Sequence, residues 1–351
     1  MNVKPLFKLM VEKQASDLFF TPFAPVKIKI DGKIMSVNKM ELSPKQVRQA
    51  AMEIMTDEQL EALGRDLEVD FAVSEQGLGR FRVNVFQQRG NIAMVLRYIT
   101  AEMPSLDQLG MPETFKELIL NKRGLILMVG ATGSGKSTTI AAMINHRNEK
   151  TASHIITIED PIEFLHKNKK SIVNQRELGL DTRSYHNAMR SALRAAPDLV
   201  MVGEIRDVET MQAALNIAGT GQLAVATLHS NNAPETLDRI INMFPVQQQK
   251  QVFIDLSQYV KAIISQRLVR NREGRRVAAV EVMLNTPHIA ELIEKGDIVG
   301  VKEAMRESKE RGMQSFDSAL LKLYQTGTIT LQEALDNADS RTNLEAQINF
   351  G

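Results

Sequence analysis

The chain contains no cysteine, and its acidic and basic residues nearly cancel. The missing cysteines exclude disulfides, a thiol nucleophile and any zinc site built from cysteine, and they fit a reducing compartment. Lysines and arginines number 43 against 42 aspartates and glutamates, which leaves a formal charge of +1. Such a balance gives no bulk attraction to nucleic acid or to anionic lipid.

Long hydrophobic runs are also missing. No apolar stretch approaches the ~18 residues that a membrane-spanning helix needs. The N-terminal stretch is interrupted by Lys8, Glu12, Lys13 and Asp17, so it makes a poor signal peptide. We therefore expect a cytoplasmic protein with no direct membrane insertion, which reaches a membrane only through a partner.

The length of 351 residues predicts about two domains, at ~150 residues each. In residues 1–99, helical patterns alternate with strands such as RFRVNVF, and an Asp31-Gly32 pair indicates a hairpin. This pattern predicts a small α+β domain with an antiparallel sheet. Residues 100–113 carry two prolines and one glycine with little periodicity, which is typical of a linker.

A different pattern follows the predicted linker. The segments GLILMVG, HIITIED, DLVMVGE and LAVATLH are almost continuously apolar, and helical patterns separate them. Such strands are typical of a parallel sheet covered on both faces. We therefore expect an α/β core over residues 114–276 and a mainly helical region over residues 277–351.

The segment GATGSGKS, residues 130–137, matches the P-loop pattern, with an apolar strand before it and a helix after it. The glycines let backbone N–H groups turn inward, and a helix N-terminus favours negative charge. Lys136 is expected to reach the β- and γ-phosphates of ATP, and the Ser137 hydroxyl to bind Mg²⁺. A chance glycine-rich turn is the alternative, which the strand and helix on either side disfavour. The residues assigned to the nucleotide are Gly130, Ala131, Thr132, Gly133, Ser134, Gly135, Lys136, Ser137 and Thr138.

Titratable residues stand at the ends of three other apolar strands. Glu159 and Asp160 follow one strand, Glu204 follows the next, and His229 follows the last. Because ligands of open parallel sheets collect at the carboxyl ends of the strands, these groups are expected to face the phosphates. For Glu204, the alternative is a merely solvated strand terminus.

The aspartate that binds Mg²⁺ in a Walker B strand is missing, because Gly203 fills the position before Glu204. The metal is then expected to be held by Ser137 and through waters. Glu204 would orient those waters or act as the general base. The candidate metal residues are Ser137, Glu204 and Glu159.

Further motifs follow along the chain: TIEDPIEF at 157–164, QRELGLDT at 175–182, VGEIRD at 202–207, ATLHSNNAPETLDRIINMFP at 226–245, SQRLV at 265–269 and GMQSFD at 312–317. Together with the P-loop, this ordered set resembles the PilT/PilU group of type IV pilus retraction ATPases, within the hexameric secretion-type ATPases. The resemblance covers essentially the whole chain. It implies a PAS-like N-terminal domain, a RecA-like ATPase domain and a homo-hexamer that drives pilus retraction and twitching motility.

The resemblance also implies roles for residues at matching positions. Glu163 and Glu204 share water activation and metal positioning, and which of them is the general base stays open. His229 resembles the histidine that senses the γ-phosphate. Arg82 and Arg97 resemble arginines that the N-terminal domain lays over the phosphates, although the residues alone favour the solvated face of a sheet. The implied partners are a paralogous retraction ATPase and the inner-membrane platform protein of the pilus, at which the protein is peripheral.

Two departures from the group's pattern bear on which branch of the group this sequence resembles. Gln222 stands in Thr220-Gly221-Gln222 where the group usually has histidine, so a titrating role at this position is in doubt. The segment VKEAMRESKE replaces the motor's Ala-Ile-Arg-Asn-Leu-Ile motif, which, with SDLFF near the N-terminus, favours the accessory PilU-like branch. The group's extension ATPases carry a four-cysteine zinc motif, so extension is not expected.

Two rival functions are weighed against the retraction motor. The first is a regulatory or coupling subunit that binds ATP, hydrolyses it poorly and acts through a partner ring. The second is a motor on DNA or RNA, supported by QRLVRNREGRR at 266–276 and by Lys167, Lys169 and Lys170. Aromatic residues are not interleaved there and the net charge is near neutral, so we expect a solvated basic loop and no nucleic acid binding.

Overall fold

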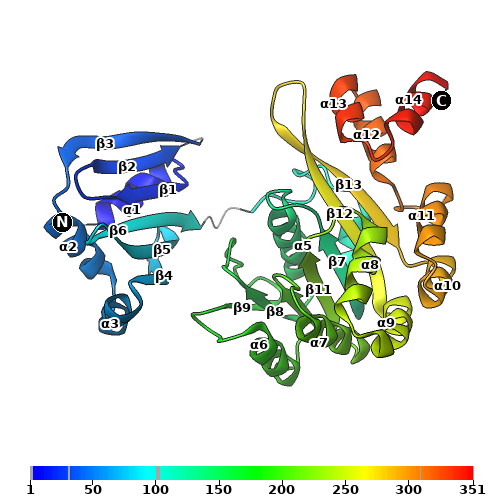
Figure 1. The fold of residues 1–351 in the computed structure, drawn as a ribbon, viewed down its shortest axis with the longest axis horizontal. Coiled ribbons are helices and arrows are strands. Elements are labelled where there is room, and N and C mark those ends of the chain that lie inside the picture. Colours follow the sequence, from blue (N-terminus) through cyan, green and yellow to red (C-terminus); the bar gives the residue numbers. More distant parts are fainter. Residues whose placement is uncertain (1–2, 31, 100–102, 309, 351) are drawn as a thin grey trace. The chain divides into compact units, whose positions relative to one another are not determined.

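A computed structural model describes residues 3–30, 32–99, 103–308 and 310–350. They divide into two compact units, each of which is described by itself (Figure 1). The N-terminal unit contains the described residues up to Ile99 together with Glu163–Leu165. The C-terminal unit contains Met103–Ile162 and the described residues from His166 onward. In the described part of the chain, no helix combines the length and the apolar character needed to cross a membrane.

The described residues of the N-terminal unit form a six-stranded antiparallel sheet and three helices, with the strand order β3-β2-β1-β6-β5-β4. Its elements are α1 (Lys4–Glu12), β1 (Asp17–Phe20), β2 (Pro25–Ile30), β3 (Lys33–Glu41), α2 (Pro44–Ile54), α3 (Asp57–Asp66), β4 (Glu68–Glu75), β5 (Gly79–Gln88) and β6 (Asn91–Ile99). The predicted α+β domain with an antiparallel sheet is confirmed. Strands β2 and β3 pair as the predicted hairpin, although Asp31 itself lies outside the described residues.

Strand β5 shows how the alternating pattern builds this unit. Phe81, Val83 and Val85 are fully buried, and the Phe81 ring stacks on Phe7 of α1 with centroids 4.3 Å apart. The intervening Arg82 is only partly buried, because successive side chains of a strand point to opposite faces. The core therefore lies on one side of β5 and the arginine on the other.

The C-terminal unit contains a seven-stranded sheet in the order β13-β12-β7-β11-β10-β8-β9. All neighbouring pairs are parallel except β12 and β13, which are antiparallel. The strands are β7 (Gly124–Val129), β8 (His154–Glu159), β9 (Ile172–Glu177), β10 (Leu199–Val202), β11 (Leu223–Leu228), β12 (Val260–Arg270) and β13 (Arg276–Leu284). The predicted parallel sheet is confirmed, and β9, β12 and β13 are strands that the sequence analysis did not anticipate.

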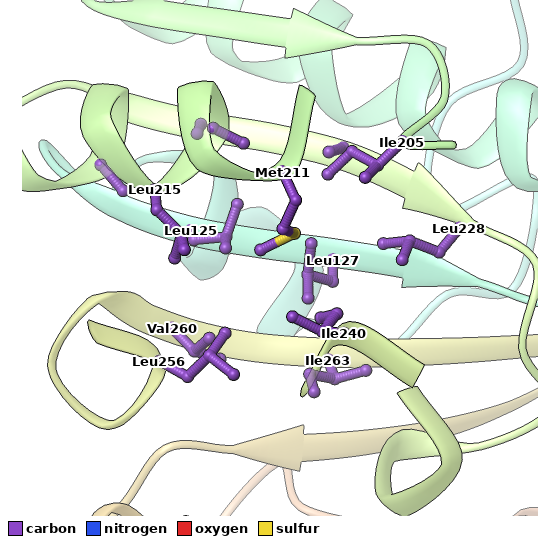
Figure 2. Close-up of a cluster of buried hydrophobic side chains, with 14 of the residues drawn as sticks. Leu125, Leu127, Ile205, Met211, Leu215, Leu228, Ile240, Leu256, Val260 and Ile263 are labelled. Atoms are coloured by element: carbon purple, nitrogen blue, oxygen red, sulfur yellow. The ribbon is translucent and has the colours of Figure 1, made fainter. Parts of the chain in front are cut away.

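Helices cover both faces of this sheet. The helices described in this unit are α4 (Thr114–Ile119), α5 (Lys136–Lys150), α6 (Tyr185–Ala192), α7 (Val208–Gly219), α8 (Ala233–Met243), α9 (Val246–Tyr259), α10 (Pro287–Lys295), α11 (Ile298–Glu307), α12 (Phe316–Gln325), α13 (Leu331–Asn337) and α14 (Arg341–Phe350). Alternate residues of β7 enter two separate cores. Leu125 and Leu127 pack with Met211 of α7 and Ile240 of α8 (Figure 2), whereas Ile126 packs on the other face with α4 and α5.

At two predicted domain boundaries, the local structure differs from the one expected. Residue 276, the predicted end of the core, is the first residue of β13, so the sheet continues to Leu284 and the helical region begins at Pro287. In the predicted linker, residues 100–102 lie outside the described residues. Leu106 and Met111 are buried with Phe115 in a core of the C-terminal unit, so this part of the segment is packed.

Candidate functional site

Residues 130–135 form the loop between β7 and α5, as the P-loop pattern predicts. Gly130, Gly133 and Gly135 have φ angles of 144°, 77° and 88°, a region that favours glycine. Helix α5 begins at Lys136, and no side chain caps its N-terminus. The first N–H groups of a helix can bind an anion, which the helix dipole also favours.

The side chains of the loop fit a phosphate group. The Lys136 side chain is largely buried, and its Nζ donates to the carbonyl oxygens of Gly130 and Ala131 at 2.7 and 3.0 Å. The buried Ser134 hydroxyl has no hydrogen-bond partner in the described structure. An unsatisfied buried hydroxyl costs about 1–3 kcal/mol, which an anion within reach would offset. An ammonium group, an unpaired hydroxyl and an uncapped helix therefore meet at one loop.

The carboxyl ends of four strands lie side by side at this edge of the sheet. Leu228 of β11 pairs with Val129 of β7, and Val202 of β10 pairs with both Ala226 of β11 and Ile158 of β8. Glu159 directly follows Ile158, His229 directly follows Leu228, and Glu204 lies two residues after Val202. The predicted juxtaposition of the strand ends is confirmed, whereas the chemical roles of the residues stay predictions.

The Glu204 carboxylate is held between two basic side chains. Its Oε1 lies 3.1 Å from His229 Nε2, and its Oε2 lies 2.7 Å from a terminal guanidinium nitrogen of Arg206. The hydrogen bond and the charge of Glu204 raise the pKa of Arg206. Arg206 also lies 4.0 Å from Asp160, and Arg239 donates to the His229 carbonyl. The ion pair that follows β10 in the sequence therefore fixes the orientation of the carboxylate.

Glycine at position 203 has a steric reason. A Cβ atom there would lie 3.0 Å from the Ile158 carbonyl oxygen and 3.0 Å from the Tyr185 hydroxyl. An aspartate therefore requires its neighbours to move. Burial, and next the charge of Asp160, raise the pKa of Tyr185, so its hydroxyl stays protonated at neutral pH.

The described residues contain no group of three or more histidine, aspartate or glutamate side chains arranged to hold a metal ion. Glu159 is buried, and its Oε1 accepts from the Thr157 hydroxyl at 2.6 Å and from Gln175 Nε2 at 3.0 Å. The hydroxyl of Ser137 and the carboxylates of Glu159 and Glu204 are oxygen donors, which suit Mg²⁺. Because Mg²⁺ keeps several waters and uses substrate phosphates, this small donor set fits the ion.

Arg82 and Arg97 are direct register partners on β5 and β6, so their side chains share the face away from the core. Arg97 Nε lies 2.8 Å from Asp17 Oδ1, and Arg82 Nε lies 3.7 Å from Asp70 Oδ1. Like charges directly opposite each other are unfavourable, and the two aspartates offset the repulsion. Both arginines belong to the N-terminal unit, to which the division of the chain also assigns Glu163. The structure thus brings Arg82 to Arg97, and separately Glu204 to His229.

Gln222 lies at the opposite end of the sheet from the P-loop. It directly precedes β11, and its Oε1 accepts from the Thr220 hydroxyl at 2.7 Å. The six residues of β11 span about 20 Å, which separates Gln222 from His229 at the other end of the strand. Within this chain, position 222 is therefore remote from the phosphate site.

The prediction of a solvated loop over residues 266–276 was wrong except at its tip. The segment lies in the β12-β13 hairpin, and only residues 271–275 form the turn. Arg267 lies 2.7 Å from Asp339 and 3.8 Å above the Phe316 ring. The sequence analysis also gave no role to Gln266, which contacts the P-loop. The apolar residues Ala262–Ile264, directly before SQRLV, were the signal for a buried strand.

Glu281 is a second residue that the sequence analysis missed. It lies on β13, and its Oε1 accepts from the Ala233 N–H at 2.7 Å and from the Ser265 hydroxyl at 3.1 Å. Burial raises the pKa of Glu281 to about 7. The charged groups nearby are Arg267, Lys302, Arg306, Asp317 and Asp339.

We expect Glu281→Gln to change how the stability depends on pH. The folded pKa lies above the unfolded value, so between about pH 5 and pH 8 the unfolded state loses its proton first and the wild type loses stability as the pH rises. The amide keeps the acceptor oxygen and never ionises. Each unit of pKa difference is worth about 1.4 kcal/mol, so the variant should gain about 2 kcal/mol on the wild type across this range. Urea unfolding at pH 5.5 and pH 8 measures the gain.

The control is Glu291→Gln, at an exposed carboxylate of α10 that pairs with Lys295. Its difference from the wild type should not grow with rising pH. A constant difference between Glu281→Gln and the wild type across the range would contradict the assignment of a raised pKa.

Comparisons with known proteins cover nearly the whole chain. The family model described as type II/IV secretion system protein matches residues 2–336. The type IV pilus ATPase PilU of Pseudomonas aeruginosa is 48% identical over 352 residues, which covers 100% of this chain and 92% of PilU. The type IV pilus retraction ATPase PilT of the same organism is 40% identical over 338 residues, which covers 96% of this chain and 98% of PilT. A crystal structure of the pilus retraction motor PilT with bound ADP matches with a TM-score of 0.92 and 43% identity, and covers 98% of this chain and 99% of that chain.

Proposed function

The chain belongs to the type II/IV secretion system protein family and is an ATPase of the PilT/PilU type IV pilus retraction group, and from this premise we propose that it is an accessory, PilU-like retraction ATPase that hydrolyses ATP with Mg²⁺ at its P-loop. The observation that carries the proposal is the Glu204 carboxylate, held between His229 and Arg206 at the sheet edge that also carries the P-loop. A basic and an acidic group at one strand edge beside a phosphate site are the parts that phosphoryl transfer to water requires.

Each residue of the proposed site has a chemical task. Lys136 exchanges its two loop carbonyls for the β- and γ-phosphates of ATP, which it neutralises. Glu204 accepts the proton of the attacking water or orients that water, a task that it shares with Glu163. His229 donates from its ring to the γ-phosphate and, through its contact with Glu204, links the phosphate to the carboxylate.

Mg²⁺ neutralises phosphate charge in this chemistry. Ser137 would hold it directly, and Glu159 or Glu204 through water. Arg82 and Arg97, side by side on the N-terminal unit, supply two more cations for the phosphates.

The assembly belongs to the same proposal. The chain forms a homo-hexamer in the cytoplasm, works beside a paralogous retraction ATPase, and reaches the inner membrane through the platform protein of the pilus. The names of the relatives support a pilus ATPase, and the near-neutral charge supports protein partners rather than nucleic acid.

The alternative is a coupling subunit that binds ATP and hydrolyses it poorly. Two observations favour it. Gln222 replaces the histidine that is usual in the group, and VKEAMRESKE, most of which forms the end of α11, replaces the motor motif. Lys309 in this segment lies outside the described residues.

The experiment that separates the two functions is ATP turnover and ADP binding by the purified full-length chain, with Mg²⁺ and with EDTA. A retraction ATPase binds ADP and releases phosphate only with Mg²⁺. A chain that binds ADP but releases no phosphate above background supports the coupling subunit. Failure to bind ADP contradicts both functions. Sedimentation of the same sample with ATP is expected to give the mass of six chains.

A further inference from the structure

Gln266 of β12 contacts the P-loop from 132 positions further along the chain. Strand β12 is the neighbour of β7, which leads into the loop (Figure 1). Only 2% of the residue is exposed. Its Nε2 donates to the Ser134 carbonyl at 2.8 Å, and its Oε1 accepts from the Thr139 hydroxyl at 2.8 Å. A carbonyl oxygen can only accept, so the nitrogen must face Ser134, and this fixes the orientation of the amide.

The loop backbone rests directly on this residue. A Cβ atom at Gly130 would lie 2.5 Å from the backbone carbonyl oxygen of Gln266, and one at Gly135 would lie 2.7 Å from the side-chain Nε2 of Gln266. Both positions therefore favour glycine for two reasons, the close approach of Gln266 and the positive φ angle. Gln266 forms the floor of the loop.

The contact with the Ser134 carbonyl also sets the direction of the Gly135 N–H. The peptide group between Ser134 and Gly135 is planar and trans, so its carbonyl and its N–H point in opposite directions. Because the carbonyl faces Gln266, the Gly135 N–H faces away from the floor. The second contact ties Thr139, in the first turn of α5, to the same amide. The loop and the helix N-terminus are thereby held in one arrangement.

We infer that Gln266 is a positioning residue of the phosphate site: it acts through the Ser134–Gly135 peptide and Thr139, and presents the Gly135 N–H to the β-phosphate of the nucleotide. The inference rests on the proposed function, in which the P-loop binds ATP. The side-chain hydrogen bonds of Gln266 go to the loop and to α5. Its effect is on how well the loop matches a diphosphate.

Gln266→Leu removes both hydrogen bonds at similar volume. We expect the dissociation constant for ADP and the KM for ATP to rise about tenfold, with kcat changed less than threefold. AMP lacks the β-phosphate, so its dissociation constant should change less than threefold. Loss of a loop donor weakens ground state and transition state alike, which raises KM. A variant that is merely less folded has fewer active molecules, which lowers the apparent kcat and leaves KM unchanged.

The matched control is Gln314→Leu. The Gln314 amide likewise donates to a backbone carbonyl at 2.8 Å, but to that of Val280 on β13, the register partner of Gln266, and not to a carbonyl of the P-loop. The Gln314→Leu variant should bind ADP as the wild type does.

A second pair of variants keeps Gln266 in place. Thr139→Val removes the hydroxyl that donates to Gln266 and should weaken ADP binding about threefold, whereas Thr139→Ser keeps a hydroxyl and restores it. This pair decides the matter if Gln266→Leu does not fold.

The inference is overturned if a folded Gln266→Leu binds ADP within twofold of the wild type, if AMP and ADP weaken equally, or if Thr139→Val and Thr139→Ser behave alike. A wild type that binds no ADP contradicts the proposed function of the P-loop instead, so the two failures are distinguishable. Calorimetric titration of ADP and AMP into the full-length protein gives the constants.

Discussion

Lys136→Ala is expected to lower kcat/KM for ATP by about 10³-fold. The Lys136 ammonium is largely buried and lies on the loop carbonyls of Gly130 and Ala131, so the substitution removes the one lysine that the P-loop carries. A hydrogen bond to a charged group contributes about 1.5–3 kcal/mol, and Lys136 is proposed to serve two phosphates. Together these losses correspond to roughly a thousandfold in rate. Phosphate release at subsaturating ATP measures the loss.

The control is Lys150→Ala at the other end of the same helix, where the side chain is exposed. It removes the same charge from α5 and should leave kcat/KM unchanged. Lys136→Met keeps most of the buried stem without the ammonium, and should be as inactive as Lys136→Ala while melting at the wild-type temperature. Hydrolysis by Lys136→Met at more than a tenth of the wild-type rate would rule out the phosphate role.

Glu204→Gln is expected to lower kcat by about 10²–10³-fold while ATP binding changes less than threefold. The amide keeps the size of the side chain, and its carbonyl oxygen can still accept from Arg206 or His229, but it cannot take up a proton. General base catalysis contributes about 10²–10⁴ in rate, which is the effect lost. Single-turnover hydrolysis, with binding measured separately, distinguishes the chemical step from affinity.

Two further variants are needed to interpret the result for Glu204→Gln. Asp207 lies three positions on and caps α7 by accepting from the Thr210 N–H at 2.7 Å. Asparagine is an equally good cap, so Asp207→Asn should hydrolyse ATP normally. Glu163→Gln tests the other candidate base. If Glu163→Gln loses more activity than Glu204→Gln, the base is Glu163 and Glu204 orients the water. If Glu204→Gln turns over at the wild-type rate, the proposed site is wrong.

Local sequence patterns predicted most of the fold and the centre of the candidate site. The alternation of Phe81, Val83 and Val85 predicted one buried face of β5, and the apolar runs before Gly130 and Gly203 predicted buried parallel strands. Each of these signals repeats within a few residues. The P-loop likewise depends on one loop and the elements on either side of it. Such features follow from backbone geometry and burial, which neighbouring residues largely determine.

Other features were beyond local pattern because they join distant parts of the chain. Strands β12 and β13 were missed, since arginines and a buried glutamate interrupt their apolar pattern. Arg267 is satisfied by Asp339 and Phe316, and Glu281 by Ser265 and the N-terminus of α8. A sequence reading sees those polar residues as solvated because their partners cannot be identified from the pattern.

Sequence patterns alone predicted an α/β protein with a P-loop and with acidic and basic groups at the ends of the neighbouring strands, and the motifs resembled those of the retraction ATPases. The fold and the strand ends follow from periodicity and from spacing within single segments, whereas the family follows from the resemblance of the motifs. The folded structure was needed to show that Glu204 lies between His229 and Arg206, that an aspartate at position 203 would require its neighbours to move, and that Gln266 supports the P-loop. Such contacts depend on strand order and register, which are set by the packing of the whole sheet.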